Sequence, residues 1–337
     1  MNFTYPFGTK FQLLKFLIEA HSFLTELDSL DNITTQVGKD LNTYIWLKNS
    51  IAFYVNSTTG IDDEDSERGK SISFPFKTLQ FALNFVSEKY NLSNYACNIY
   101  LADGSYALND ETIFPAYTST TGSIFIRSLS GNKKNVKLGR CLVKSSDYRF
   151  YNVTFAPLNN SSIDEFNVID ISGNGTVCYL DNCEYVLENI SNPNICVIKT
   201  RDGATSSIQG KQTHNIFISN SPNINCIFSI LLNSSSNIIQ NVDIFSTSVN
   251  IDAFVISSYN SIFQSYKHVS SGLDVHPVYK TYNYIDKQEN AGLFQGKRFL
   301  VNLNSIINID TTPNNLNEFF PGSLSGLVES GGIYIAY

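Results

Sequence analysis

The chain is poor in several features that mark common protein classes. Only 16% of its 337 residues are charged, and a single Trp and a single Met accompany 19 Tyr and 24 Phe. After about residue 50 there is no long stretch of Glu, Lys, Ala and Leu, the residues that favour helices. Because 42% of the residues are hydrophobic, the chain is too apolar to be disordered. The recurring Asn, Ser, Ile and Thr favour strands and turns.

Charge and cysteine spacing exclude two further classes. The formal charge is −7 and no Lys/Arg run is present, which disfavours nucleic acid as a partner, since phosphate binding needs a clustered basic face. The six cysteines form no CxxC pair and no spacing with His that suits zinc. We therefore expect free thiols in the core, no metal site and no cofactor.

The N-terminus lacks the features of a secretory signal. The segment MNFTYPFGTKF has no basic start, apolar run or small-residue cleavage site, and no segment has the length of a membrane span. We expect synthesis in a cytoplasm and no membrane insertion. If the protein works outside a cell, virion assembly followed by lysis would carry it there.

Apolar residues near the N-terminus follow a heptad, which favours helices that associate through a seam, as in a short coiled coil. The alternative is one or two amphipathic helices that cap a globular domain, because residues 28–32 could break the helix. We assign residues 1–50 as a helical region for attachment or trimerisation. The two registers are Leu13, Ala20, Leu27 and Leu41, and Phe16, Phe23, Leu30, Val37, Tyr44 and Ile51.

Residues 51–110 read as a compact opening unit of strand, loop, helix and strand. The strands are expected at 51–56 and 98–106, and the helix is expected to begin near Pro75. The acidic loop from Asp62 to Glu67 could bind Ca²⁺ through oxygen ligands, but its spacing departs from the EF-hand, and a solvated loop is the alternative. One helical face is expected to hold Leu79, Ala82, Leu83 and Val86.

Beyond residue 120 the chain is a succession of short β segments separated by Asn, Gly and Ser. Similar units recur roughly every 20 to 30 residues, the range of a solenoid. They lie around Asn152, Asn182, Asn215, Asn241 and Gln264. One unit cannot bury its own apolar residues, so neighbouring units must stack to bury them. The inward residues are expected to be Val153, Phe155, Cys183, Tyr185, Ile216, Ile218, Val242 and Ile244. Asn at a repeated turn tolerates left-handed geometry and can bond to the Asn of the next unit.

Both ends of the chain resemble one group. FYVNSTTGIDDEDSERGKSISFPFKTLQFALNFV with NIYLADGSY resembles the opening of pectin-lyase-like phage tail proteins, and residues 292–334 are similar to the closing segment of tail spikes and fibres. The resemblance implies a mainly β fold, a single-stranded right-handed parallel β-helix that follows N-terminal helices and forms a homotrimer. The β-helix body would span 111–275 and the closing segment 276–337. The matching residues are Gly60, Asp62, Pro75, Phe76, Thr78, Leu79, Gln80, Ala82, Asp103, Gly104 and Tyr106, and then Gly296, Lys297, Arg298, Phe299, Ile306, Ile307, Phe320, Pro321, Gly322, Gly326, Gly331, Gly332 and Tyr334.

The resemblance also implies a function. Tailspikes of this kind bind and commonly depolymerise a bacterial surface polysaccharide, capsule or O-antigen, by hydrolysis or by β-elimination. The protein would then be located in the virion, on the phage tail, after synthesis in the host cytoplasm. Its partners would be the polysaccharide, two further copies of itself, and other tail proteins through the N-terminal region.

Candidate site residues lie in the middle of the repeats. Hydrolysis needs two carboxyl groups about 5 to 9 Å apart, and a pair two residues apart on a strand or stacked on adjacent coils meets this distance. An odd separation puts Asp181 and Glu184 on opposite faces of a regular strand unless a turn intervenes. The expected catalytic residues are Asp181, Glu184 and Asp202, and the expected substrate-binding residues are Arg201, His214, Asp243 and Tyr266.

Three functions remain open at this point. The first is a receptor-binding tailspike that degrades its polysaccharide. The second is a non-enzymatic, glycan-binding adhesin of the same fold, favoured by the lack of a clear carboxylate constellation. The third is a structural component of the tail. The motif series of the polygalacturonases is missing, which argues against a plant-pectin substrate.

Overall fold

A computed structural model describes residues 44–65, 67–159, 164–210, 212–221, 223–265, 268–270, 273–275, 277–309 and 319–336. The chain divides into two compact units, Met1–Ile45 and Trp46–Tyr337. The heptad of the N-terminal region lies almost wholly outside the described residues, so the helices expected there stay a prediction. The second unit consists mostly of β-strands.

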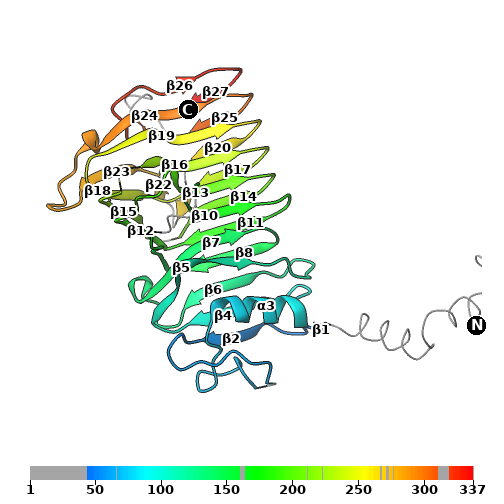
Figure 1. The fold of residues 1–337 in the computed structure, drawn as a ribbon. Helices are drawn as coiled ribbons and strands as arrows, with labels where there is room; N and C mark the ends of the chain where they lie inside the picture. The colour runs from blue at the N-terminus through cyan, green and yellow to red at the C-terminus, as the bar shows by residue number, and fades with distance from the viewer. Residues whose placement is uncertain are drawn as a thin grey trace, which may run out of the picture. The chain divides into compact units, whose positions relative to one another are not determined.

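One of two large sheets has ten strands in the described part of the chain, and every neighbouring pair is parallel. In Figure 1 these strands follow one another in chain order from β2 to β27. They are β2 (Ile51–Val55), β4 (Cys97–Leu101), β6 (Ile124–Ser128), β8 (Asp147–Tyr151), β11 (Val177–Asp181), β14 (Thr205–Gln209), β17 (Ser235–Ile238), β20 (Ile262–Ser265), β25 (Ile306–Ile309) and β27 (Ile333–Ala336).

The other large sheet has thirteen described strands and two arms that meet at β7 (Val136–Val143), with β5 (Gly104–Phe114) paired to β7 beside them. The long arm contains β10 (Asn167–Ser172), β13 (Ile195–Arg201), β16 (Ile224–Leu231), β19 (Val249–Ser258), β24 (Phe294–Val301) and β26 (Leu327–Val328). The short arm contains β9 (Thr154–Phe155), β12 (Glu184–Glu188), β15 (His214–Ser219), β18 (Val242–Ser246) and β23 (Tyr279–Asn283).

The smaller elements lie outside these sheets. Two short sheets pair β1 (Ile45–Trp46) with β3 (Tyr90–Asn91) in one case and β21 (His268–Ser270) with β22 (Leu273–Val275), antiparallel, in the other. Among the described residues, no helix has both the length and the apolar character needed to cross a bilayer. The helices are α3 (Leu79–Lys89) and the 3₁₀ turns η1 (Lys133–Asn135) and η2 (Ala291–Leu293).

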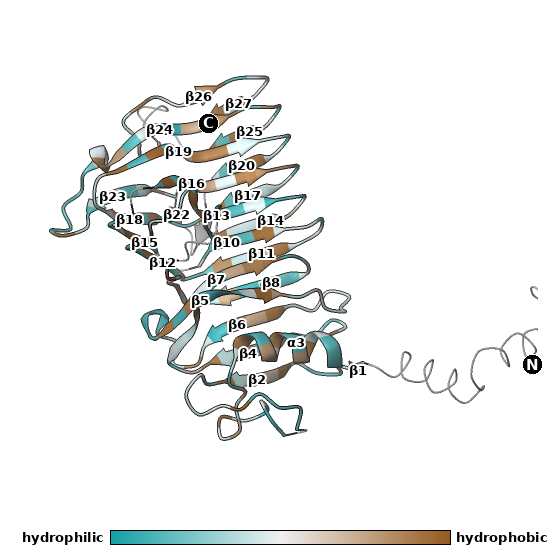
Figure 2. Ribbon diagram, in the orientation of Figure 1, coloured by the Kyte–Doolittle hydropathy of each residue, from teal (hydrophilic) through white to brown (hydrophobic). Residues whose placement is uncertain are grey.

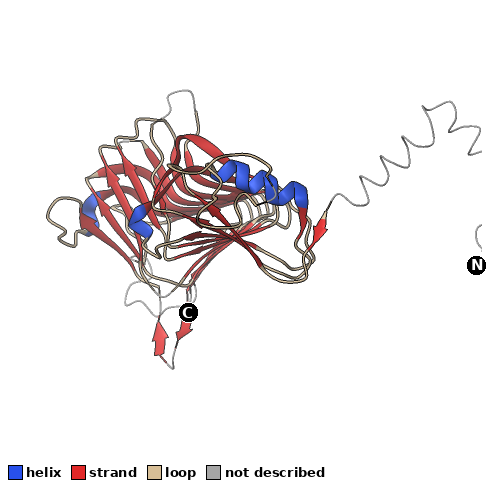
Figure 3. Cartoon of the chain, turned by 90° about the horizontal axis from the view of Figure 1, so that it is seen from below, coloured by secondary structure: helices blue, strands red, loops and turns tan. Residues whose placement is uncertain are grey.

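The chain visits the sheets in a fixed order. It passes through β10 of the long arm, β11 of the ten-stranded sheet and β12 of the short arm, and then repeats this path with β13, β14 and β15. Each such triplet forms one layer, and in-register side chains that bond across layers are 30 or 31 residues apart. Figure 3 shows the strands of successive layers lying behind one another. Long, all-parallel sheets of this kind are compatible with a β-helix or solenoid.

The interior between the sheets is apolar. Strands alternate between apolar and polar residues, as the colours of Figure 2 show, so that each layer turns one set of side chains inward. All eight residues expected to point inward are at most 1% exposed, which confirms that prediction. The six cysteines are free and buried, as expected.

Left-handed residues form the corners between strands. Asn152 and Asn182 have φ angles of 55° and 52°, and Asn220 Nδ2 donates to Asn189 Oδ1 of the preceding layer at 3.1 Å. The expected Asn-to-Asn bond between layers is thus confirmed. The expected repeat was wrong at two units, because Asn215 lies inside β15 and Gln264 lies in β20 of the other sheet.

A second set of corners, between the long arm and the ten-stranded sheet, is held by serines. The hydroxyl oxygens of Ser234, Ser261 and Ser305 accept from the backbone N–H groups of Gly203, Ser234 and Ser261 at 3.0 to 3.2 Å. These hydroxyls are buried, so each bond satisfies a backbone donor that water does not reach.

The helix of the opening unit begins later than expected, at Leu79, because Thr78 is its N-cap and accepts from Phe81 N. Asp62 of the acidic loop accepts from the N–H groups of Lys77 and Thr78 and so extends this cap. The four residues expected on its buried face are at most 2% exposed, as predicted. The strand expected at 98–106 is two strands, β4 and the beginning of β5, because the chain turns between them.

Candidate functional site

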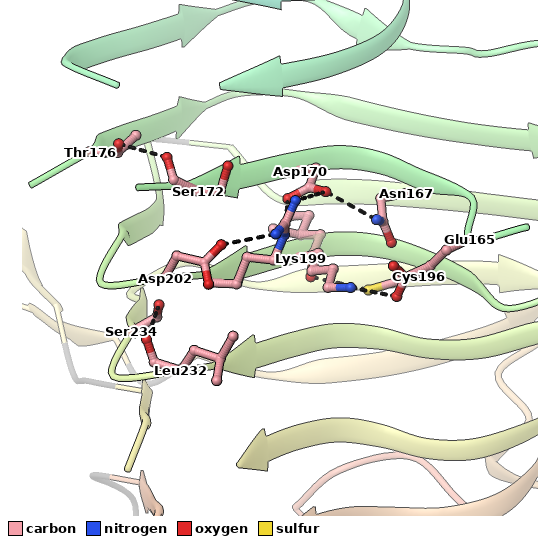
Figure 4. A network of polar contacts seen from close by, with 12 residues as sticks. Glu165, Asn167, Asp170, Ser172, Thr176, Cys196, Lys199, Asp202, Leu232 and Ser234 are labelled. Carbon is pink, nitrogen blue, oxygen red and sulfur yellow. Dashed lines mark hydrogen bonds and ion pairs between the residues drawn. The ribbon is translucent and has the colours of Figure 1, made fainter. Parts of the chain in front are cut away.

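The predicted site residues that the structure describes lie at four different places in the layers. Asp202 occupies a corner after β13, with φ of 60°, a conformation that Asp tolerates. Its carboxylate accepts from Arg201 Nη1 at 2.9 Å. Arg201 in turn donates to both oxygens of Asp170 on β10, at 3.0 and 3.2 Å. Figure 4 shows Asp170 and Asp202 at the two ends of this arrangement.

The same outward face of the long arm holds a second ion pair. Lys199 Nζ contacts Glu165 Oε1, and Asn167 Nδ2 donates to Asp170 Oδ2 at 3.3 Å (Figure 4). The pKa of Arg201 is raised, mainly by its bond to Asp170. Arg201 and Asp202 are thus each paired with a neighbouring charge, and the catalytic and binding roles expected of them stay a prediction.

Asp181 and Glu184 belong to different sheets. Asp181 ends β11 and Glu184 begins β12, and the left-handed Asn182 turns the chain between them. The turn that the sequence allowed between these two residues is therefore present. It places Asp181 on the ten-stranded sheet, in register with Tyr151 and Gln209, and Glu184 on the short arm.

His214 lies in the core, so its expected contact with substrate is wrong. It is 0% exposed, its Nε2 donates to Gln209 O at 2.7 Å, and its ring stacks on Tyr185. Burial lowers the pKa of His214 to about 4. A neutral imidazole is needed here because a buried charge without a partner is costly. Tyr266 lies outside the described residues.

The outward face of the short arm brings together Glu184 and Asp243. In-register pairing aligns Glu184, Asn215, Asp243 and Lys280 across four neighbouring strands, and we call these four the polar row. Asn215 Nδ2 donates to Glu184 Oε1 at 3.2 Å, and Lys133 Nζ lies 3.4 Å from the same oxygen. Glu184 is only 3% exposed. Its carboxylate is already paired with the Lys133 ammonium group and the Asn215 amide.

Aromatic side chains stack two residues further along the same strands. The ring centroids of Phe217 and Phe245 are 5.0 Å apart, as are those of Phe245 and Tyr282, with interplanar angles of 14° and 18°. These three residues, which we call the aromatic row, are half-buried and face outward. A stack of flat rings beside a row of polar groups thus runs across the layers.

A third set of groups borders the aromatic row. The Tyr284 hydroxyl donates to Glu188 Oε1, and this bond raises the pKa of Tyr284 to about 12. Lys287 Nζ lies 5.2 Å from the centroid of Phe245 and 4.4 Å from that of Tyr284. The rings are therefore flanked by carboxylates and cations on both sides.

Asp243 differs from the other acidic groups of this face. Burial raises its pKa, Lys280 opposes the shift, and Glu289 adds to it. Lys280 Nζ bonds to Glu289 Oε2 at 3.0 Å, and within the described chain the Asp243 carboxylate forms no hydrogen bond. A half-buried carboxyl group with a raised pKa beside a half-buried ring stack can donate a proton or bind a hydroxyl group.

The aromatic row was missed by sequence reasoning, although a signal for it exists. When β12, β15, β18 and β23 are aligned on the polar row, the position two residues later reads Val, Phe, Phe, Tyr. The shifted assignment of Asn215 hid this column, because it moved β15 by two residues relative to its neighbours.

Comparison with protein-family models, curated proteins and solved structures finds no match for this chain. Its function is therefore inferred from the residues and their geometry.

Proposed function

We propose that the chain is a bacteriophage tailspike that binds a bacterial surface polysaccharide on the outward face of the short arm. In this proposal the layers form a right-handed parallel β-helix, and three copies form the particle. The observation that carries it is the half-buried, outward-facing aromatic row of Phe217, Phe245 and Tyr282 beside the polar row.

The chemistry of the face suits a sugar polymer. The stacked rings largely cover one another's faces, so a sugar would contact their outward apolar edges, while neighbouring amide, carboxyl and ammonium groups bond to its hydroxyls. The aromatic row extends across three layers, so successive sugars of one chain could contact successive rings. The rings are half-buried, so part of each remains open to a ligand.

Replacing the central ring tests binding. Phe245→Ala should weaken binding of purified capsule or O-antigen roughly tenfold, the effect of losing about 1.4 kcal/mol. Phe74→Ala is the matched control, because Phe74 is an exposed ring, 55% accessible, in the opening unit. Isothermal calorimetry would measure both. Equal affinity of Phe245→Ala and the unaltered protein would count against the proposal.

A second candidate function is hydrolysis of the bound polysaccharide, favoured by Asp243. Asp243 and Glu184 lie two strands apart, roughly 9.6 Å by strand spacing. This is close to the upper end of the separation of about 6.5 to 9.5 Å in inverting glycosidases. Asp243, with its raised pKa, would be the acid and Glu184 the base. The ion pair of Glu184 with Lys133 opposes the base role, so binding without cleavage remains the better supported function.

Release of reducing ends distinguishes the two candidates. If the chain hydrolyses its ligand, Asp243→Asn should abolish the release while binding persists. Asp252→Asn, which alters an exposed acid of β19, should leave the release unchanged. A protein that binds polysaccharide and releases neither reducing ends nor unsaturated sugars is an adhesin.

The proposed assembly has its own test. The heptad of residues 1–50 would join the copies and attach them to other tail proteins. Sedimentation equilibrium should give three times the chain mass of 37.7 kDa. A mass equal to that of one chain would refute the trimer while leaving the binding face intact.

A further inference from the structure

A second outward-facing group of aromatic residues lies on the ten-stranded sheet, apart from the short arm. In-register pairing aligns Tyr54, Tyr100, Arg127 and Tyr151 across β2, β4, β6 and β8. The rings of Tyr54 and Tyr100 stack at 5.6 Å. All four side chains are half-buried, so their outer surfaces meet solvent.

A parallel row lies two residues earlier on two of these strands, β6 and β8, and continues on β11. It aligns Phe125, Arg149 and Tyr179 across β6, β8 and β11. Phe125 also stacks on Tyr151 of the first row, with centroids 5.8 Å apart. We call these seven residues the arginine platform.

The two arginines of the platform lie over its rings. The guanidinium carbon of Arg127 is 4.4 Å from the centroid of Tyr151 and 4.7 Å from that of Phe125. The guanidinium carbon of Arg149 is 4.5 Å from the ring centroid of Tyr179 and 5.4 Å from that of Phe125. Such stacking fixes the planes of both guanidinium groups and leaves their edges to form hydrogen bonds.

Only one of these arginines has a counter-ion in the part of the chain that the structure describes. Arg149 donates to both oxygens of Asp147, at 3.2 and 2.9 Å. Arg127 forms no ion pair or hydrogen bond there, and its Nε is buried without a partner. A half-buried cation that lacks an anion is a costly arrangement, and an anionic ligand would relieve the cost.

We infer that the arginine platform is a binding site for a carboxylated sugar of an acidic polysaccharide. Arg127 pairs with the sugar carboxylate, and Tyr100 and Tyr151, the neighbours of Arg127 in the first row, contact the sugar ring. Charge complementarity selects a carboxylate at Arg127, whereas Asp181, in register beyond Tyr151, limits the site at that end of the row. The inference rests on this sheet and does not depend on the short arm.

Binding of alginate and hyaluronate, each compared with its carboxyl-reduced neutral form, tests the inference on the full chain. The unaltered protein should bind at least one acid form roughly tenfold more tightly than its reduced form. Arg127→Gln should remove this preference. Arg68→Gln is the matched control, because Arg68 also lies over a ring, Phe74, at 5.8 Å, but is paired with Asp63. It should keep the preference.

The ratio of acid to neutral affinity is the readout that a purely structural role of Arg127 would not change. Arg127→Lys keeps the charge without the planar fork, and it should retain part of the preference if the variant is folded. Three outcomes would overturn the inference: no binding of either acid polymer, an unchanged ratio in Arg127→Gln, or binding that Phe245→Ala removes and Arg127→Gln retains. The last would locate the acidic polymer on the short arm and would support the proposed function alone.

Discussion

The two arms of the thirteen-stranded sheet use their outward faces differently. On the long arm, charged side chains pair with one another, as Arg201 does with Asp170 and Asp202. On the short arm, the polar row includes Asp243, whose carboxylate has no hydrogen bond within the described chain, and the aromatic row beside it is half exposed. Both arms come from the same layers.

Under the proposed function, one architecture would separate stability from recognition. In-register stacking brings every outward residue within about 5 Å of its counterpart in the next layer. On the long arm, the charges of neighbouring layers pair with each other, which joins the layers. Rings at that spacing stack on one another and still turn an edge outward. The short arm can therefore hold its layers together and, under the proposed function, contact a ligand at the same time.

Removing the Asp170 carboxylate tests the difference between the two arms most directly. Asp170→Ala should lower the free energy of unfolding by about 3 kcal/mol, because it leaves Arg201 half-buried without its main partner. Urea denaturation would measure the change. Asp252→Ala, an exposed site on the same arm, should cost less than about 0.5 kcal/mol. Equal losses in the two variants would show that the long-arm ion pairs do not hold the layers.

The inner face of the short arm should respond to pH through His214. Its pKa is about 4 in the folded protein and 6.5 ordinarily, so the unfolded chain binds the proton first as the pH falls. Stability is therefore complete above pH 6.5 and is lost between about pH 6.5 and 4, by about 3 kcal/mol. His214→Leu should flatten this part of the stability profile. An unaltered slope in that variant would assign the effect to other groups.

Sequence reasoning predicted the local parts of this fold well. The buried face of α3 and the inward residues of β9, β12, β15 and β18 follow from periodicities of 3.6 and 2, which are visible within a few residues. The corners were harder to predict, because Thr213 takes the turn position that Asn182 holds one layer earlier. The expected layer at β15 was therefore shifted by two residues.

The candidate site was predicted only in part, for a related reason. Asp243 and Glu184 were expected to be functional, and the structure places both on one outward face. Phe217 and Phe245 lie 28 residues apart in the numbering and meet only through the register of stacked strands. The pairing of Arg201 with Asp170 is diagonal, because the register puts Arg201 opposite Ser172, and short-range patterns carry no trace of it.

The smallest expected effect concerns Asp243 and has the opposite sign to that of Asp170. Burial raises the pKa of Asp243, so the folded protein holds this proton at a pH where the unfolded chain has released it. The contribution of Asp243 to stability is thus lost as the pH rises from its ordinary pKa of 3.8 through the raised value. Asp243→Asn should raise the free energy of unfolding at pH 7, by less than about 1 kcal/mol because the group is partly exposed. At pH 3 the two proteins should be equally stable. A variant less stable than the unaltered protein at pH 7 would mean that the ionised carboxylate stabilises the short arm, and that this arm resembles the long arm after all.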